Sequence, residues 1–336
     1  MKAQRYLVIG SGSIARRHIA NLRRLFPLAE VACISASGRP LTCADTGATH
    51  VWPDLASALG ASVSFAVVAS PAPFHIAHAT ELVNKGVPVL IEKPLASSLE
   101  LFKADGHILK ANANRVEVAY NMRYLTSAVR MKKLLEEGIP GRIYTVLIDV
   151  GQYLPDWRPG TDYRNNVSAR KDLGGGVLLE LSHELDYLGW LFGGFTTAFC
   201  VAGRSACLDI DVEDSVDALL VREDGLVANL HMDFLQRAAT RVCKVIGERG
   251  TIEWNLNQNK ITWLTGNGAS EVLFNDPDYD RNDMYIQELL SFSRVAEGLA
   301  PPAVSLAQAE QVLQLVDALR LSAKTQQAVC IRSVGQ

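Results

Sequence analysis

Residues 87–96, with the sequence VPVLIEKPLA, place an acid, a base and a proline directly after an apolar run of strand length. Lysine is rarely buried without a partner, so Lys93 at the end of a core strand indicates a functional role. Its ammonium has three donors and can bond two oxygens of a ligand at once. Pro94 restricts Lys93 to extended conformations and so would aim its side chain. We expect Glu92, Lys93 and Pro94 to line a ligand site; a lysine that simply reaches water would explain Lys93 alone.

A second group of reactive side chains falls on a predicted helix, residues 177–192. At about 100° per residue, leucines and a phenylalanine form the core face, and a polar face lies opposite. That polar face carries Glu180, His183, Asp186, Tyr187 and Trp190. Polar groups interleaved with aromatics are typical of a sugar pocket, although a solvated face would also be polar. Histidine suits a general base at neutral pH, so we expect His183 to take a proton and Glu180 and Asp186 to bind substrate.

A glycine motif follows the first predicted strand, residues 6–9. Gly10, Gly12 and Ala15 form GxGxxA at the start of a predicted helix. The first glycine permits a tight turn, the second lets the backbone approach a pyrophosphate, and the alanine allows close packing. The helix N-terminus adds N–H groups and a favourable dipole. The alternative is a purely structural turn, but in this context we expect a dinucleotide to contact Gly10, Gly12, Ser13 and Ile14.

The end of the second predicted strand indicates which dinucleotide is bound. A carboxylate about 20 residues beyond the glycines would hold the ribose 2′-hydroxyl of NAD. Glu30 precedes this strand and Asp45 lies well beyond it, so neither is placed for that bond. The tip carries Ser35, Ser37 and Arg39 instead, which are donors suited to a 2′-phosphate. These residues favour NADP over NAD as the cofactor; a solvated loop with an unrelated arginine is the alternative.

The third predicted strand ends in the sequence SPAPFH. Ligands of open α/β sheets bind at the carboxyl ends of the strands, so we expect Ser70, Pro71 and His75 to contact the cofactor. His75 and His78 are spaced as in some metal sites, but no third ligand is nearby in the sequence. A histidine that packs at a helix start is the better interpretation, and we expect no metal.

The elements that position these residues follow from the hydrophobic pattern. Apolar runs occur at 6–9, 31–34, 64–69, 87–91 and 116–119, and helical patterns at 14–25, 72–85 and 99–112. Continuously apolar strands that alternate with helices predict a doubly wound parallel sheet, the α/β Rossmann fold. From about residue 142 strand-like runs follow one another, with Asp224 and Gly225 in a tight hairpin turn. This pattern predicts an α+β region with a large, mainly antiparallel open sheet.

Length and composition limit the classes of function. A chain of 336 residues favours two domains, which we place at 1–120 for dinucleotide binding and 121–336 for substrate binding and oligomerisation. The net charge of −3 argues against nucleic acid, and no apolar run is long enough to span a membrane. The first residues lack the pattern of a secretory signal, and the six cysteines are scattered. We therefore expect reduced thiols and a cytoplasmic location.

Two further segments supply candidate substrate contacts. Residues 161–176 form a long polar loop before the helix, and such loops often carry binding residues. Arg164, Asn165 and Lys171 are candidates there, although a merely solvated loop fits equally well. The motif NMRY adds three more candidates, Asn121, Arg123 and Tyr124.

The motifs occur in the order GxGxxA, SPAPFH, EKP, NMRY and GGGVLLELSHELD. In this order they resemble the Gfo/Idh/MocA oxidoreductases, the glucose–fructose oxidoreductase and inositol dehydrogenase superfamily, over nearly the whole chain. The resemblance implies that Lys93 contacts nicotinamide ribose and a substrate hydroxyl, that the Lys93–Pro94 peptide is cis, and that His183 is the catalytic histidine. One position departs from the family pattern: Leu179 stands four residues before His183, where many members carry aspartate.

The resemblance also implies an activity. It indicates an NAD(P)-dependent oxidoreductase that transfers hydride between nicotinamide and a carbinol or carbonyl of a sugar, inositol or nucleotide-sugar. Two alternatives stay open: a non-catalytic regulator that senses dinucleotide or sugar, and a reductase of a non-sugar substrate such as a pyrrole pigment or dihydrodiol. We further expect a homodimer or homotetramer that assembles through the sheet of residues 142–265.

Overall fold

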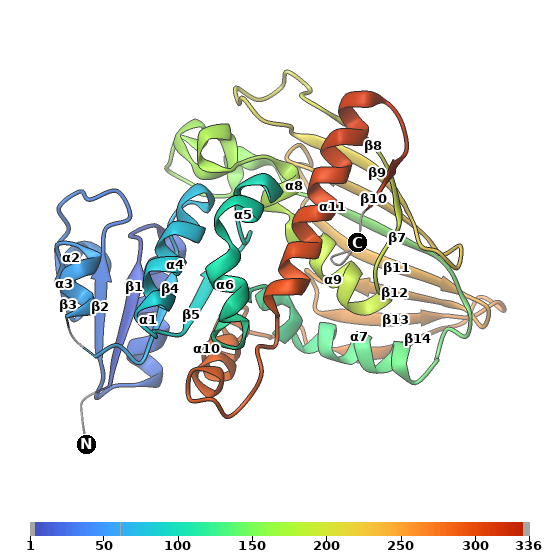
Figure 1. Ribbon diagram of the computed structural model, residues 1–336. Helices are drawn as coiled ribbons and strands as arrows, with labels where there is room; N and C mark the ends of the chain where they lie inside the picture. The colour runs from blue at the N-terminus through green and yellow to red at the C-terminus, as the bar shows by residue number, and fades with distance from the viewer. Residues whose placement is uncertain (1–3, 61, 332–336) are drawn as a thin grey trace. The chain divides into compact units, whose positions relative to one another are not determined.

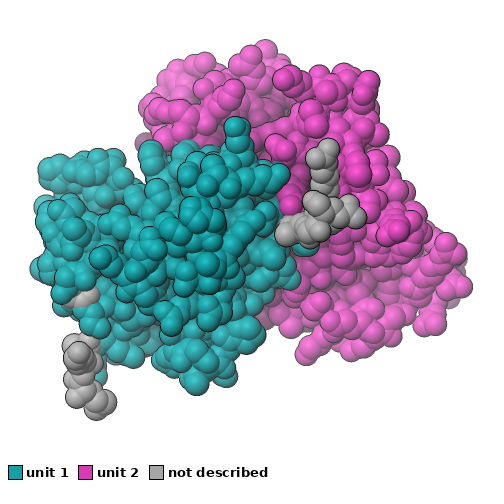
Figure 2. All heavy atoms as spheres, viewed as in Figure 1, with its two compact units in different colours: residues 1–121, 282–313 teal, residues 122–281, 314–336 magenta. Residues whose placement is uncertain are grey.

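The computed structural model describes residues 4–60 and 62–331. The chain divides into two compact units (Figure 2). Unit 1 contains residues 1–121 and 282–313, and unit 2 contains residues 122–281 and 314–336. The sequence prediction divided the chain once, near residue 120. The structure differs in that a later segment, 282–313, returns to unit 1.

Unit 1 is built on a six-stranded parallel sheet with the order β3-β2-β1-β4-β5-β6. Its strands are β1 (Arg5–Ile9), β2 (Glu30–Ile34), β3 (His50–Trp52), β4 (Phe65–Val68), β5 (Val89–Glu92) and β6 (Val116–Ala119). The predicted doubly wound Rossmann sheet is confirmed. Only the edge strand β3 was not predicted, because its three residues are exposed or half-buried and form no apolar run.

Helices and short turns connect these strands (Figure 1). They are α1 (Ser13–Leu25), α2 (Cys43–Thr46), α3 (Leu55–Leu59), α4 (His75–Asn84), α5 (Leu99–Asp105) and α6 (His107–Ala111). The predicted helix 99–112 is thus two helices. Gly106 separates them, and a Cβ at that position would lie 2.5 Å from the ring of Phe102. The absence of a side chain at Gly106 therefore lets the ring of Phe102 pack against the backbone there, which hydrophobic periodicity does not reveal.

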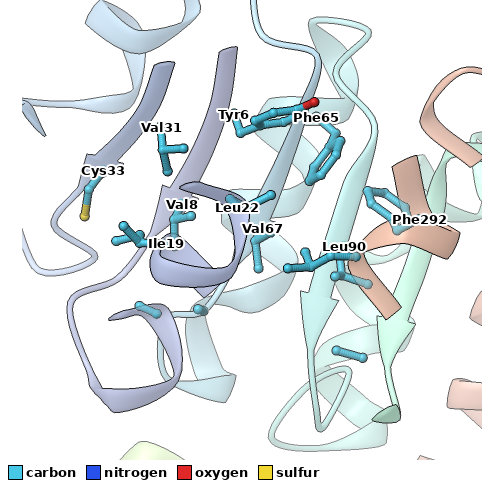
Figure 3. Packing of buried hydrophobic residues seen from close by; sticks show 14 of the residues in the cluster. Tyr6, Val8, Ile19, Leu22, Val31, Cys33, Phe65, Val67, Leu90 and Phe292 are labelled. Carbon is cyan, nitrogen blue, oxygen red and sulfur yellow. The ribbon is translucent and has the colours of Figure 1, made fainter. Parts of the chain in front are cut away.

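The core of unit 1 contains side chains from strands β1, β4 and β5 and from the returning segment, residues 282–313. Helix α10 (Asp283–Ala296) places Phe292 against Phe65 of β4, with ring centroids 5.2 Å apart and an edge-on geometry. Figure 3 shows Phe292 beside Leu90 and Phe65, and Tyr6 and Val67 in the same cluster. All of these side chains are almost fully buried. Burial of this apolar surface ties α10 to the Rossmann sheet.

Unit 2 is built on a nine-stranded sheet with the order β14-β13-β12-β11-β7-β10-β9-β8-β15. Its strands are β7 (Ile143–Gly151), β8 (Thr197–Gly203), β9 (Ser215–Val221), β10 (Val227–Asp233), β11 (Thr240–Gly247), β12 (Thr251–Asn255), β13 (Lys260–Leu264), β14 (Ser270–Asn275) and β15 (Val329–Cys330). Among the described strands of this sheet, β7 and β10 pair in parallel and the other neighbours pair antiparallel. The predicted mainly antiparallel sheet is confirmed, as is the hairpin, in which Gly225 has a φ of +89° between β9 and β10.

Helices cover one face of this sheet. They are α7 (Thr126–Glu136), α8 (Val177–Glu180), α9 (Ser182–Phe192) and the last part of α11 (Leu306–Thr325). Figure 1 shows α9 and α11 over the sheet, where Tyr187 packs edge-on against Trp254 and Ser322 accepts a hydrogen bond from the backbone of Cys200. Strand residues alternate between buried and exposed, so the other face of the sheet is open.

Candidate active site

The parallel strands of unit 1 end beside one another in the segments that the sequence singled out. Gly10 follows β1, Ser35 follows β2, Ser70 follows β4, Glu92 ends β5 and Asn121 follows β6. Because parallel strands share one carboxyl edge, all five residues lie along the same edge of the sheet. The strand order reverses between β1 and β4, which is the position where open α/β sheets bind ligands.

The glycine loop has the geometry of a phosphate cradle. Gly10 has a φ of +126°, and a Cβ there would lie 2.4 Å from the carbonyl oxygen of Ala69. At Gly12, a Cβ would meet no described atom within 4 Å, so the backbone is open to a ligand. Ser13 and Ile14 begin α1, and within the described residues no side chain caps this helix. Its first N–H groups can therefore bind an anion such as the pyrophosphate of a dinucleotide.

The tip of β2 lies against this loop. Arg39 donates a hydrogen bond from Nη2 to Oγ of Ser11, over 2.9 Å, and the hydroxyls of Ser35 and Ser37 are 3.4 Å apart. Asp45 lies in α2, where it forms a capping box with Thr42 that lowers the pKa of its carboxyl. The three predicted cofactor residues at the tip of β2 therefore lie beside the glycine loop or beside each other.

His75 has a different environment from the one expected. Its Nδ1 is 2.8 Å from the carbonyl oxygen of Pro94, and its Nε2 is 2.6 Å from that of Ser70. The ring is almost fully buried, and this burial lowers its pKa. His78 Nδ1 is 3.1 Å from Oγ of Ser70. Because both ring nitrogens of His75 face protein carbonyls, this histidine joins the loops after β4 and β5 and offers no ring nitrogen to a cofactor.

The end of β5 is fixed from two sides. Glu92 is buried, its Oε1 is 2.6 Å from Nε2 of His18, and its Oε2 accepts a 3.2 Å hydrogen bond from the backbone N–H of Lys93. Lys93 itself is half-buried, and the Lys93–Pro94 peptide is cis, as the resemblance implies. Glu92 therefore contacts its own loop and α1.

Three residues at this edge were missed by the sequence analysis. His18 lies on α1, and Tyr285 and Glu288 lie on α10. Asn121 hydrogen-bonds the hydroxyl of Tyr285, so the returning segment reaches the end of β6. One signal was available: His18 stands at helical spacing among the apolar residues Ala15, Ile19 and Leu22, as a polar residue on a core face.

In unit 2, two predicted substrate residues bind each other instead. Arg123 donates from Nε and Nη2 to the two carboxylate oxygens of Asp186, at 2.9 and 2.6 Å. Both side chains are buried, and burial raises the pKa of Asp186 against the opposing effect of the guanidinium. Tyr124, next in the chain, is half-buried at the end of the same short helix, Asn121–Tyr124. The pair therefore anchors α9 to residue 123.

The predicted polar face of the helix 177–192 is also different in detail. The helix is interrupted at Leu181, so Glu180 ends α8 and His183 lies in the first turn of α9. Tyr187 is buried against Trp254 and does not line an open face, and Trp190 lies 5.6 Å from the guanidinium of Arg123. Glu180, His183 and Trp190 are half-buried, whereas Asp186 and Tyr187 are buried.

The long loop keeps its polar residues near the surface. Arg164 forms a two-bond ion pair with Asp162 and also reaches Asp209. Asn165 and Lys171 are exposed, and the backbone N–H of Lys171 is held by Asp211. Within the described residues, no cluster of three or more metal-ligating side chains occurs, and no helix is long and apolar enough to cross a membrane.

Comparison with known proteins identifies the family. Residues 4–120 match a model described as an oxidoreductase family with an NAD-binding Rossmann fold, and residues 128–253 match the GFO/IDH/MocA C-terminal domain. The chain belongs to the Gfo/Idh/MocA oxidoreductase family. It is therefore an oxidoreductase with an NAD-binding fold, as the order of its motifs indicated.

Relatives and solved structures agree with this assignment. The chain is 26% identical over 283 residues to inositol 2-dehydrogenase 2 of Paenarthrobacter aurescens, which covers 79% of each protein. It is 27% identical to inositol 2-dehydrogenase of Streptomyces avermitilis, covering 88% of this chain and 86% of that one. Levoglucosan dehydrogenase in complex with NADH has a TM-score of 0.86 at 20% identity, over 99% of this chain and all of that one. The WlbA dehydrogenase of Bordetella pertussis, in complex with NADH and UDP-GlcNAcA, has a TM-score of 0.81 at 22% identity over the same shares. At these identities the two structures show the fold alone.

Proposed function

We propose that this family member transfers hydride between a nicotinamide cofactor and a carbinol carbon of a sugar, inositol or nucleotide-sugar. The observation that carries the proposal is the position of Lys93, at the carboxyl end of β5 on the same edge as the open backbone of Gly12. Supporting it, the relatives are named inositol and levoglucosan dehydrogenases. When bound, the nicotinamide supplies the hydride acceptor or donor.

In this proposal the two catalytic residues come from different units. His183 takes the proton of the substrate hydroxyl as a general base while the hydride leaves the same carbon. Lys93 donates a hydrogen bond to that oxygen and stabilises the negative charge that develops on it. In reduction the same groups act in reverse, with His183 as the acid. The roles require His183 and Lys93 to act on one substrate oxygen.

We further propose a preference for NADP. The family model describes an NAD-binding fold, and several structural neighbours contain NADH. Support for NADP comes from the residues that follow β2. Arg39 donates a hydrogen bond to Ser11 of the glycine loop, and the sequence has no aspartate or glutamate between Ile34 and Asp45. A guanidinium forms a charge-assisted hydrogen bond with the 2′-phosphate of NADP, which is stronger than its bond with the neutral 2′-hydroxyl of NAD.

The experiment is an oxidation screen with paired variants. Inositols, free sugars and nucleotide-sugars are mixed with NADP⁺ or NAD⁺, and the absorbance of the reduced nicotinamide is followed. We expect turnover of at least one compound class by the wild type, none by Lys93→Met, and a kcat lowered about 10²–10⁴-fold in His183→Asn. Dinucleotide titration of Lys93→Met provides the control, because the glycine loop is untouched. Normal turnover by either variant would contradict the proposed mechanism.

The open face of the unit 2 sheet is where we propose that copies of the chain pack, as a homodimer or homotetramer. Exposed apolar side chains lie on adjacent strands, and Phe199 of β8 stands opposite Leu219 of β9. Phe199→Arg should lower the mass measured by light scattering to that of a monomer. Leu28→Arg is the matched control, since Leu28 is 95% exposed in unit 1. A monomeric wild type at micromolar concentration would refute the proposal.

A further inference from the structure

His18 is a polar side chain on the buried face of α1. It lies six residues after Gly12, which corresponds to about 9 Å along the helix from the glycine loop. Its side chain is fully buried, between Ala15 and Leu22 on the same face of the helix. Burying an imidazole here removes its hydrogen bonds to water, so the cost of desolvation has to be offset by a partner inside unit 1.

That partner is Glu92. His18 Nε2 lies 2.6 Å from Oε1 of Glu92, and the other oxygen of the same carboxyl accepts the backbone N–H of Lys93. No described residue offers a hydrogen-bond partner to Nδ1 of His18. The imidazole therefore makes one bond, and this bond connects the helix of the glycine loop to the peptide of Lys93.

The surroundings of Glu92 make this bond difficult to replace. Glu288 of α10 is fully buried, and burial followed by the charges of Glu92 and Glu117 raises its pKa far above the ordinary value. Neither carboxyl oxygen of Glu288 has a hydrogen-bond partner within the described residues. Glu117 is buried as well and accepts a bond from the backbone of Ala303. These carboxyls offer Glu92 no stabilising charge, whereas the imidazole of His18 lies within hydrogen-bond distance of it.

We propose that His18 is a positioning residue for the reaction: through Glu92 it fixes the backbone at Lys93 relative to the dinucleotide-binding helix. The inference rests on the proposed function, in which Lys93 holds the substrate oxygen. A bond from α1 to the end of β5 holds the lysine in register with a cofactor bound at the N-terminus of the same helix. Small displacements of a catalytic group are costly, because a misplacement of about 1 Å can reduce the rate about 10²-fold.

The test compares three substitutions on α1. His18→Leu removes the donor and should lower kcat about 10- to 100-fold, with the dissociation constant for NADPH within about threefold of the wild type. His18→Gln has its amide nitrogen the same number of bonds from Cβ as Nε2, so it should recover most of the lost kcat. Asn21→Leu is the matched control: Asn21 is also buried on α1, but its side chain bonds Asn282 and not Glu92. Asn21→Leu should lower the thermal stability and leave kcat within about threefold of the wild-type value.

The outcomes separate the inference from the function on which it rests. A kcat that is unchanged in His18→Leu overturns the inference, and so does a glutamine variant no better than the leucine variant. An equal loss of kcat in Asn21→Leu also overturns it, because any weakening of α1 would then suffice. If Lys93→Met turns over normally, the proposed function fails instead, whatever the three variants do.

Discussion

The carboxyl edge of the unit 1 sheet and helix α9 of unit 2 both concentrate charged side chains, but they use them differently. On α9, Glu184 and Asp186 each form a two-bond ion pair inside unit 2, with Arg241 and Arg123. At the sheet edge, buried polar groups such as His75 bond backbone carbonyls and so shape the loops themselves. Charged groups on α9 therefore position a helix, whereas polar groups at the strand ends position the loops that follow the strands.

The largest expected effect is on the free energy of unfolding, and it tests whether the ion pairs of α9 have a structural role. Arg123→Leu should lower the free energy of unfolding by about 3–5 kcal/mol, because it leaves Asp186 buried without its partner. The measurement is urea denaturation followed by circular dichroism. Arg164→Leu is the matched control: the Arg164 side chain is 55% exposed and pairs with the exposed Asp162, so it should cost about 0–1 kcal/mol.

The result also decides between two roles for Arg123. A variant that keeps its stability but loses affinity for substrate would show that Arg123 binds the ligand, as the sequence analysis expected. In that case α9 and the sheet edge would not differ in the way described above. A large loss of stability with retained substrate affinity would confirm the anchoring role.

The positions of the strand ends could be predicted from the sequence because they depend on the topology of the sheet and not on side-chain contacts. Once continuous apolar runs predict parallel strands, Gly10, Ser70 and Lys93 share one edge whatever the side chains do. The cis peptide between Lys93 and Pro94 was expected from the family resemblance, which rests on local motifs as well. Short-range patterns of this kind are visible in a single sequence.

The polar face of α9 could not be read in the same way. Arg123 is 63 residues from Asp186, and Arg241 is 57 residues from Glu184, so neither pairing leaves a local trace. Helical periodicity places polar residues on one side but does not say whether that side meets solvent or buried arginines. The same limit applies to His18 and Glu92, which are 74 residues apart.

A smaller effect is expected at the tip of β2, where the sequence alone indicated the cofactor. Arg39→Ala should weaken NADPH binding by about 1.5–3 kcal/mol and leave NADH binding nearly unchanged, because the proposed partner of the guanidinium is a 2′-phosphate, which NADH lacks. Calorimetric titration with both dinucleotides measures the difference. Arg24→Ala, on the exposed last turn of α1, is the control. Equal or tighter binding of NADH by the wild type would remove the basis for an NADP preference.

The smallest effect concerns an exposed ion-pair group on the open face of the unit 2 sheet. His231 of β10 has Nδ1 2.7 Å from Asp217 of β9 and Nε2 2.9 Å from Asp233, and Asp149 of β7 stands opposite it in the register. Partial burial lowers the pKa of His231, but the bonds and charges of Asp217 and Asp233 outweigh it and raise the pKa above the ordinary value. The pairing therefore stabilises the fold below the unfolded pKa, and this contribution is lost as pH rises through the folded pKa.

His231→Gln should accordingly cost up to about 1 kcal/mol at mildly acid pH and almost nothing in alkaline buffer, since the side chain is 41% exposed and solvent screens the charges. Thermal unfolding of wild type and variant across that range measures the gap. Asp217→Asn should shrink the same pH-dependent gap, because it removes the larger of the two favourable partners. A gap that widens with rising pH would mean that His231 is held neutral in the fold. A neutral ring has a single N–H, so only one of the two aspartates could then accept a hydrogen bond from it. Unlike Arg123 and Arg241, which bond α9, His231 would then contribute no charge.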